Sequence, residues 1–313
     1  MPSTLLEHQF ELAPVDGDGL VFGTEDTGYL TTTRPQIVSG ELRTNDIPRP
    51  GEDGLMTSRD YVGGDLYTFE MGVLTDVNNL VLAPGSPAEA YAMNLDYLGV
   101  LKGWWRDPLW RSTARSMAML RTCQAGRTSR CYGRPRRYDE VTGFLTRVGY
   151  STVVCDFQLI DNRFYSDEEY STEIGLAQPP DGGLVAPLVA PLTTTPESRT
   201  EGVATITGNT PTWLVVEFHG PVTNPSISIG DLTIGLTGTL AYDEVITVDP
   251  RPWARTALRN TDGASFAGLL SRETPAMKNM LIAPGTYGLL YRGLDPSGSS
   301  TARIRWRNAR NRP

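Results

Sequence analysis

The segment Trp213-Leu214-Val215-Val216-Glu217-Phe218, which stops at His219-Gly220-Pro221, begins the part of the chain that decides the fold. Short segments in which apolar and polar residues alternate continue after it, at Ile227–Ile229, Leu232–Leu236, Val245–Val248, Tyr287–Tyr291 and Ala302–Trp306. Gly, Pro or Asp residues separate them. A hydrophobic period of two gives a strand one buried face and one solvated face. We therefore predict a β-sandwich over residues 203–313.

The composition is that of a folded protein with many turns. Of the 313 residues, 39% are hydrophobic and 20% are charged, which excludes a disordered chain. The net charge of −8 lacks the basic footprint that nucleic-acid-binding proteins need. The N-terminus lacks the features of a signal peptide, and no stretch is apolar for long enough to span a bilayer. We expect neither secretory export nor membrane contact.

The first part of the chain predicts a second β domain, over residues 1–177. Strand patterns occur at Tyr67–Met71, Gly143–Val148 and Ser151–Leu159. A Pro-rich connector over residues 178–202, in which no helix fits, should then separate the two domains. The chain is therefore expected to be mainly β, with two domains.

One helix is expected within the first domain, near residues 87–102. Ser86-Pro87-Ala88-Glu89 has the pattern of a capping box, with proline at the first helical position. Gly103 should end the helix. The apolar residues expected to pack on the sheet are Ala88, Tyr91, Leu95 and Leu98.

The sequence predicts no catalytic residue. The two histidines, His8 and His219, lie in a terminal segment and at a strand end, without the context of a catalytic triad. Three cysteines are too few for a disulfide scaffold. A Cys123–Cys131 bridge is possible, but free thiols, Cys155 included, are favoured in a chain assembled in a cytoplasm.

No cofactor-binding or metal-ligating residue is predicted either. Phosphate-binding glycine loops and His/Cys ligand clusters are both missing from the sequence. The acids considered for calcium are Asp76, Asp156, Asp161 and Asp167-Glu168-Glu169. None has the spacing of a calcium loop, so a solvated charge run is favoured. No pair of acids stands out as a glycosidase pair.

Two unusual clusters have several interpretations. Trp104, Trp105 and Trp110 could stack on sugars, pack in the core or form a subunit contact. The arginines of Arg134–Arg137 could contact phosphates. Pairing with carboxylates of a neighbouring subunit is favoured, because the protein is acidic.

Several segments resemble distal tail proteins of long-tailed phages, here of the kind that infects GC-rich actinobacteria. In the first half these are Tyr132–Tyr138 and Asn162–Asp167. In the second half they are Gly208–Trp213, Gly220–Pro225, Val248–Arg255, Leu281–Tyr287 and Ala302–Arg307. The resemblance extends from about residue 60 to the end of the chain.

The resemblance implies a non-enzymatic virion protein, assembled in the host cytoplasm and located at the tail tip. Its N-terminal domain, a split barrel like that of tail tubes, would form a homohexameric ring, and the loop 43–59 could reach a neighbouring copy. The ring would join the major tail tube protein to the hub protein of the tip or baseplate, with tape measure and receptor-binding proteins as further partners. DNA would pass through the lumen of the ring without specific binding.

The C-terminal domain would resemble galectins and carbohydrate-binding modules. The alternative functions are a carbohydrate-binding module for adhesion to the host cell wall and, ranked last, a glycan hydrolase.

Overall fold

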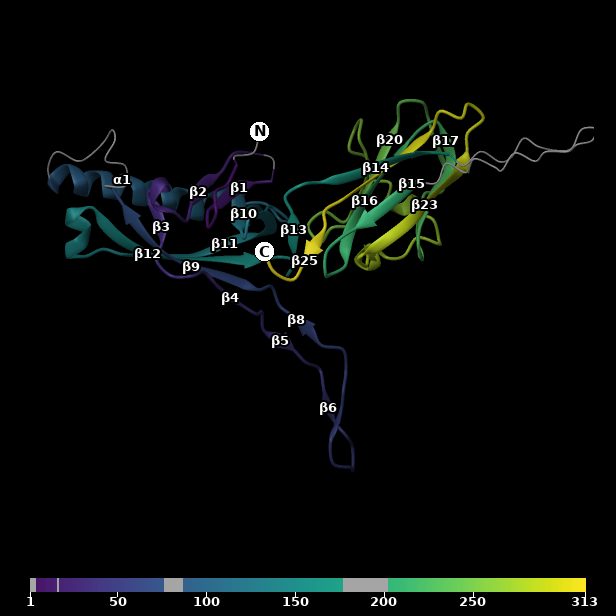
Figure 1. The fold of residues 1–313 in the computed structure, drawn as a ribbon. Helices are drawn as coiled ribbons and strands as arrows, with labels where there is room; N and C mark the ends of the chain where they lie inside the picture. The colour runs from purple at the N-terminus through teal and green to yellow at the C-terminus, as the bar shows by residue number, and fades with distance from the viewer. Residues whose placement is uncertain (1–3, 16, 76–86, 177–201) are drawn as a thin grey trace, which may run out of the picture. The chain divides into compact units, whose positions relative to one another are not determined.

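Strands dominate both halves of the chain (Figure 1). The computed structural model describes residues 4–15, 17–75, 87–176 and 202–313. The chain divides into unit 1, which comprises Met1–Asp167 and Asn311–Pro313, and unit 2, which comprises Glu168–Arg310. Residues 168–175, which the sequence grouped with the first domain, thus belong to unit 2. The expected connector, apart from Gly202, lies outside the described residues.

Unit 1 is built on one large sheet whose strands pair antiparallel. In spatial order they are β2 (Leu20–Phe22), β1 (Phe10–Pro14), β10 (Ala118–Gln124), β11 (Arg127–Val141), β12 (Tyr150–Leu159), β9 (Leu66–Leu74) and β3 (Tyr29–Thr31). β4 (Gln36–Val38) also pairs with β9, and β13 (Phe164–Ser166) with β11. Short 3₁₀ helices are η1 (Glu25–Thr27), η2 (Pro108–Trp110) and η3 (Phe144–Val148).

The two ends of this sheet come together, so that it forms a nearly closed barrel. Gly23, which follows β2, forms a bridge with Leu30 of β3. The Gly23 N–H donates to the carbonyl of Tyr29 at 2.7 Å. Gly23 has φ +124°, and a Cβ there would lie 2.3 Å from the His8 carbonyl, so only glycine suits this closure.

The core of unit 1 lies between the inner face of the sheet and the helix α1 (Pro87–Arg106). Alternate residues of β12, from Val153 to Leu159, point into it and are buried. Phe69 packs edge-on against Phe10 and Trp105, with ring centroids 5.1 and 6.2 Å away. These contacts place the helix across the inner face of the sheet.

The helix itself is confirmed, but the predicted buried face is wrong. Of the four residues expected to face the sheet, only Leu98 is buried. The buried stripe is Ala90, Asn94, Leu98, Leu101 and Trp105. The helix continues past Gly103 because this extra turn carries Trp105 into the core; it ends before Asp107-Pro108, where proline disfavours helical backbone. Ser86, the expected cap, lies outside the described residues.

Asn94 is the polar member of the buried stripe, and hydrogen bonds explain its burial. Its Nδ2 donates to the carbonyls of Val73 and Gly149 at 3.0 and 3.1 Å, and its Oδ1 accepts from Ser151 Oγ at 2.6 Å. These bonds tie α1 to the end of β9 and to the segment between η3 and β12. A buried side chain with all its polar atoms paired specifies one position for the helix.

Asn94→Ala is expected to lower the free energy of unfolding of unit 1 by about 1–3 kcal/mol, because two buried carbonyls each lose a donor. Asp96→Ala, on the exposed side of the same helix, should change it by less than about 0.5 kcal/mol. Urea unfolding followed by tryptophan fluorescence measures both. Equal effects of the two substitutions would show that the Asn94 bonds do not matter.

One predicted strand in unit 1 is a helix instead. Residues 143–148 contain the 3₁₀ helix η3 and not a strand. The Gly143 N–H donates to Thr146 Oγ1 at 2.9 Å, and Thr146 is buried. The buried threonine therefore anchors the turn, while the apolar residues that suggested a strand, Phe144, Leu145 and Val148, are exposed.

Unit 2 is a β-sandwich of two antiparallel sheets, as predicted. The first sheet has the order β14 (Tyr170–Gly175), β24 (Thr301–Trp306), β16 (Thr212–His219), β20 (Val245–Asp249) and β21 (Thr256–Arg259), and β22 (Leu281–Ile282) also pairs with β16. The second has the order β15 (Gly202–Ile206), β23 (Gly285–Leu294), β17 (Val222–Ile229) and β18 (Leu232–Gly235), and β19 (Thr239–Leu240) also pairs with β17. The remaining elements are η4 (Ala267–Leu269), η5 (Met277–Asn279) and β25 (Ala309–Arg310).

The alternation seen in the sequence creates the core of the sandwich. Leu214, Val216 and Phe218 point inward from β16, and Ile227 and Ile229 do so from β17. All five are buried. β14 belongs to this sandwich because it pairs along its whole length with β24, which explains why unit 2 begins before the expected connector.

Candidate assembly surfaces

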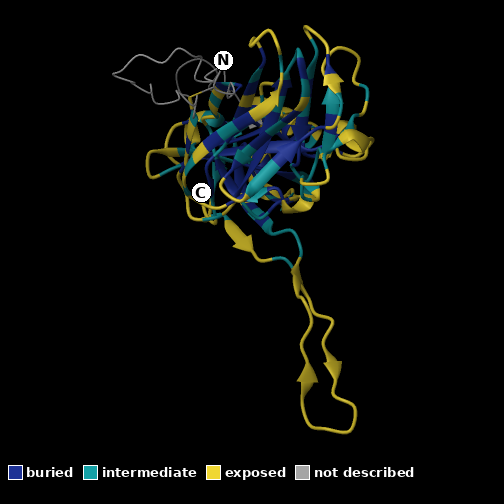
Figure 2. Cartoon of the chain, turned by 90° about the vertical axis from the view of Figure 1, so that its right-hand side faces the viewer, coloured by how far each residue is buried: buried dark blue, intermediate teal, exposed yellow. Residues whose placement is uncertain are grey.

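A two-stranded arm extends from the sheet of unit 1 (Figures 1 and 2). It continues β4 and β9, and we define the arm as residues 41–62. Its strand pairs are β5 (Leu42–Arg43) with β8 (Tyr61–Val62) and β6 (Ile47–Pro48) with β7 (Leu55–Met56). The loop 43–59, which the resemblance suggested could reach a neighbouring copy, is therefore part of a β-ribbon.

The arm narrows to a neck of two facing glycines, Gly40 and Gly63. The Gly63 N–H donates to the Glu41 carbonyl at 2.9 Å, and the Gly40 N–H donates to Asp65 Oδ1 at 2.9 Å. A Cβ on Gly40 would lie 2.3 Å from the Gly63 carbonyl oxygen, so a side chain there would force the two strands apart. The neck thus sets where the ribbon leaves the sheet.

Every residue of the arm is exposed, including its apolar ones (Figure 2). Six large apolar side chains are each at least half exposed: Leu42, Ile47, Leu55, Met56, Tyr61 and Val62. A two-stranded hairpin alone is marginally stable in water, and apolar side chains of this kind are stabilised when another surface covers them. The geometry of the arm therefore suits a contact with another molecule.

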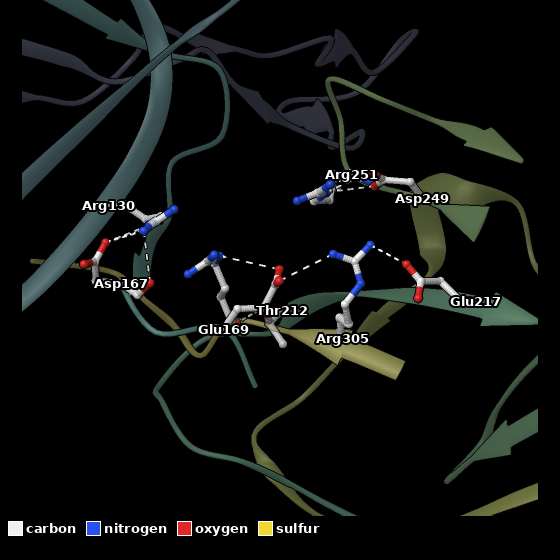
Figure 3. Close-up of polar contacts among 9 residues, drawn as sticks. Arg130, Asp167, Glu169, Thr212, Glu217, Asp249, Arg251 and Arg305 are labelled. Carbon is white, nitrogen blue, oxygen red and sulfur yellow. Dashed lines mark hydrogen bonds and ion pairs between the residues drawn. The ribbon is translucent and has the colours of Figure 1, made fainter. Parts of the chain in front are cut away.

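The arginines of the 127–138 stretch mostly serve unit 1 itself. Arg130 Nε donates to Asp167 Oδ1 at 3.0 Å (Figure 3). Arg134 donates to the backbone carbonyls of Ser116 and Thr113 at 2.6 and 3.0 Å. The bonds of Arg134 are thus local, and its pairing with carboxylates of a neighbouring subunit stays a prediction.

Arg130 belongs to a buried ion cluster that connects β1, β10 and β11. Arg121 contacts Asp167 through two hydrogen bonds, of 3.0 Å from Nε and 2.8 Å from Nη2, and also contacts Glu11. The Arg121 and Glu11 side chains are only 3% and 5% exposed. Asp167 is thus a structural anion in unit 1, and not part of a solvated charge run.

The cluster predicts an acid-sensitive contribution to stability. Burial raises the pKa of the Asp167 carboxyl, but hydrogen bonds and charges from Arg121 and Arg130 outweigh it, and the pKa lies below its usual value. Because the folded pKa is depressed, the stabilisation is present above the unfolded aspartate pKa of about 3.9 and is lost as the pH falls through the folded value. Thermal unfolding of the wild type should therefore lose more stability below pH 4 than an Asp167→Asn variant. An equal loss would contradict this role.

A second polar network lies on the outer face of the first sheet of unit 2 (Figure 3). Arg305 of β24 contacts Glu217 of β16 at 2.7 Å and Glu169 at 3.4 Å. On the same sheet, Arg251 Nη2 contacts Asp249 Oδ2 at 2.6 Å. The two pairs of Arg305 join β24 to β16 and to the segment before β14. Glu169 is therefore a structural anion of unit 2.

The tryptophan cluster of unit 1 packs in the core. Trp105 and Trp110 are fully buried, and Trp104 packs partly buried beside them. Trp105 Nε1 donates to the Asp156 carbonyl at 3.0 Å, and Trp110 Nε1 donates to the Trp104 carbonyl at 2.8 Å. Of the three interpretations, core packing is the one that the structure supports.

The remaining candidate residues are not brought together. His8 is exposed in unit 1, and His219 Nε2 lies 3.9 Å from Glu217 Oε2 in unit 2. Within the described ranges, no three His, Cys, Asp or Glu side chains are placed to hold a metal ion. Asp156 accepts from Thr68 Oγ1 at 2.8 Å, Asp161 accepts from the Tyr165 hydroxyl at 2.7 Å, and Asp76 lies outside the described residues.

The three cysteines are buried free thiols. Burial raises the pKa of the Cys131 and Cys155 thiols. In the register of β10 and β11, Cys123 lies opposite Thr128, and Cys131 lies opposite Leu120. The two thiols considered for a bridge therefore sit at different levels of the strand pair.

Among the described helices, none is long and apolar enough to cross a membrane.

No family model matches the chain, and no curated protein matches its sequence. Several solved structures share its fold, including the following two. The first is the SPP1 Dit (gp 19.1) protein, described as a paradigm of the hub adsorption apparatus in phages that infect Gram-positive hosts; it has a TM-score of 0.54 at 13% identity, over 96% of this chain and 98% of that chain. The second is a chain of the phage p2 baseplate in its activated conformation with Sr, with a TM-score of 0.50 at 12% identity, over 95% and 97% of the two chains.

These matches confirm the predicted fold class. A barrel-like β domain with one helix and a β-sandwich are both present, and the likeness to a Dit protein extends over nearly the whole chain. At 12–13% identity the similarity establishes the fold, whereas function is argued separately from the surfaces described above.

Proposed function

We propose that this chain is a structural protein of a phage tail tip, in which six copies form a ring that joins the tail tube to the tip or baseplate hub. The observation that carries the proposal is the arm. Its residues are all exposed, and its apolar side chains have the character of an interface without its partner.

A ring requires each copy to contact its neighbour through two different surfaces, because identical surfaces would give only a two-fold dimer. The arm supplies one such surface from unit 1. Asn162 anchors the root of the arm in unit 1: its Nδ2 donates to the Gly63 carbonyl at 2.8 Å, and its Oδ1 accepts from the Asp65 N–H at 2.8 Å. This is the geometry expected of a repeated contact between copies.

The similar folds support the same assignment. The SPP1 Dit protein is described as a hub component, and the p2 chain was solved within a baseplate. By analogy, unit 1 would form the ring, and the sandwich of unit 2 would attach tip, tape measure or receptor-binding proteins. The proposed protein has no catalytic activity.

The charge of the chain suits a conduit for DNA. The net charge is −8, so a ring of six copies would carry a strongly negative field. Such a field repels phosphates and would let the genome pass without specific binding. We assign assembly of the ring to the host cytoplasm and its final location to the virion.

Electron microscopy of particles that carry an epitope-tagged copy of this chain tests the location. Antibody label should appear only at the end of the tail that is distant from the capsid. Label along the tail or on the capsid, or particles without this chain, would contradict the proposal.

Glycan binding by unit 2 stays a prediction from the sequence. Trp253 is an aromatic residue of unit 2 that could stack on a sugar; it is partly buried, and the Arg251 guanidinium lies 5.5 Å from its ring centroid. One face of the ring is thus already covered by a cation. A pull-down of the full chain with host cell wall, compared with Trp253→Ala, measures whether the other face binds sugar.

A further inference from the structure

The helix α1 has an apolar surface on the side that faces away from the sheet. Tyr91 and Leu95, one turn apart, share one flank of the exposed side and are 42% and 43% exposed, whereas Val100 lies on the opposite flank and is 49% exposed. Four small residues share the exposed side: Ala88, Ala92, Gly99 and Gly103. The same side also carries the exposed charged residues Glu89, Asp96 and Arg106, so its apolar part is the patch at Tyr91 and Leu95.

The neighbouring turn η3 enlarges this surface. Phe144 is 79% exposed, and Leu145 and Val148 are both 55% exposed. η3 packs beside the N-terminal half of α1. Asn94 of α1 donates a hydrogen bond to the carbonyl of Gly149, the residue that follows η3. We call Tyr91, Leu95, Phe144, Leu145 and Val148 together the α1–η3 surface. Thr146 of η3 is buried and forms hydrogen bonds with Gly143 and Ser151. These bonds fix the turn so that Phe144, Leu145 and Val148 stay exposed.

The arm of the same copy does not cover this surface. The arm joins β9 at Leu66, whereas Leu74 at the other end of β9 pairs with Tyr150, which follows η3. At about 3.3 Å per residue, the two ends of β9 are about 26 Å apart. The arm leaves the sheet from the end opposite η3 (Figure 1).

The two surfaces complement each other in chemistry. The arm presents exposed Ile47, Leu55 and Met56, and its tip carries Glu52 and Asp53. The α1–η3 surface is apolar, with the exposed Arg147 in its middle. Within the described part of the chain, neither Arg147 nor the two tip acids form an ion pair, so each lacks a counter-charge that the other surface offers.

We infer that the arm of one copy docks on the α1–η3 surface of the next copy, with Ile47, Leu55 and Met56 covering Leu95, Phe144 and Val148, and with the tip acids beside Arg147. This inference rests on the proposed ring and names the receiving surface within it. The contact is heterologous: each copy gives an arm on one side and receives one on the other. Repetition of such a contact closes a ring of six copies when the contact rotates each copy by one sixth of a turn relative to its neighbour.

Cysteine cross-linking of the full chain tests the contact. The double variant Met56→Cys, Phe144→Cys should form covalent multimers of up to six chains under mild oxidation, because the three native thiols are buried. Met56→Cys with Val203→Cys is the matched control, since Val203 is also an apolar residue that is more than half exposed, and it belongs to unit 2. It should give no multimers beyond those of Met56→Cys alone.

Charge substitution gives an independent readout. Phe144→Asp should raise the concentration for half-assembly at least about tenfold, whereas Val203→Asp should not change it. If the wild type forms a ring, but Phe144→Asp assembles normally and the double cysteine variant does not cross-link, the inference is overturned and the proposed ring stands on another contact. A wild-type chain that forms no ring removes the proposed function, and the inference with it.

Discussion

Replacement of residues 42–62 by Asn-Gly is expected to abolish assembly while both units stay folded. Glu41 and Gly63 are hydrogen-bonded neighbours, so a two-residue turn can join them without moving the sheet. The removed residues are all exposed, so the free energy of unfolding should change by less than about 1 kcal/mol. Light scattering should then show only the monomer mass, at concentrations where the wild type assembles.

The control for this deletion keeps the apolar side chains of the arm. Thr44 and Thr57 are exposed polar residues of the arm, and Thr44→Ala with Thr57→Ala should assemble as the wild type does. If the deletion variant still formed the complete ring, the arm would not be the interface. The proposal would then have lost the observation that carries it.

Removal of the Arg121 side chain is expected to be the most destabilising single substitution considered. In Arg121→Met, Glu11 and Asp167 keep their burial but lose their main cation. Loss of one partner from a buried ion pair costs about 3–5 kcal/mol, because an uncompensated charge remains. Urea unfolding should show this loss in the transition of unit 1.

The matched control is Arg137→Met. Arg137 pairs with Asp139 on the surface, where both side chains are more than half exposed, so its removal should have little effect on stability. If Arg121→Met were as stable as this control, the cluster would not hold β1, β10 and β11 together. The pH dependence assigned to Asp167 would then need another source.

Much of the sandwich could be predicted from the sequence because several of its strands, such as β17 and β24, carry their own alternation. Ile227 and Ile229 of β17, which alternate with serines, show the period of two without reference to any other segment. The helix was also predicted, but not its buried face. Asn94 is buried through hydrogen bonds to Val73 and Gly149, which are far from it in sequence, so apolar spacing alone could not reveal it.

The assembly surfaces could be predicted less well, for two physical reasons. Phe144, Leu145 and Val148 form a short apolar run, and such a run does not distinguish a strand from a turn whose side chains are exposed. The arm contains two prolines, Pro48 and Pro50, and two glycines, Gly51 and Gly54, a composition typical of a loop. Its ribbon depends on the pairing of the two sides across the neck at Gly40 and Gly63, which no local pattern encodes.

The ion cluster illustrates the same limit. Glu11 and Arg121 lie 110 residues apart in sequence and meet only because β1 pairs with β10. The arginine-rich stretch was conspicuous in the sequence, but its partners were not. Within that stretch Arg130 finds its carboxylate, Asp167, in the same unit, which no local pattern indicated.

The mass of the intact wild-type assembly, measured by native mass spectrometry, tests the central proposal most directly. One chain has a mass of 34.3 kDa. A hexameric ring predicts a dominant species of six times that mass, which electron microscopy of the same sample should show as rings. The proposal would be contradicted by two results together: the mass of a single chain at every concentration, and particles whose tail tip contains this chain in a number of copies other than six.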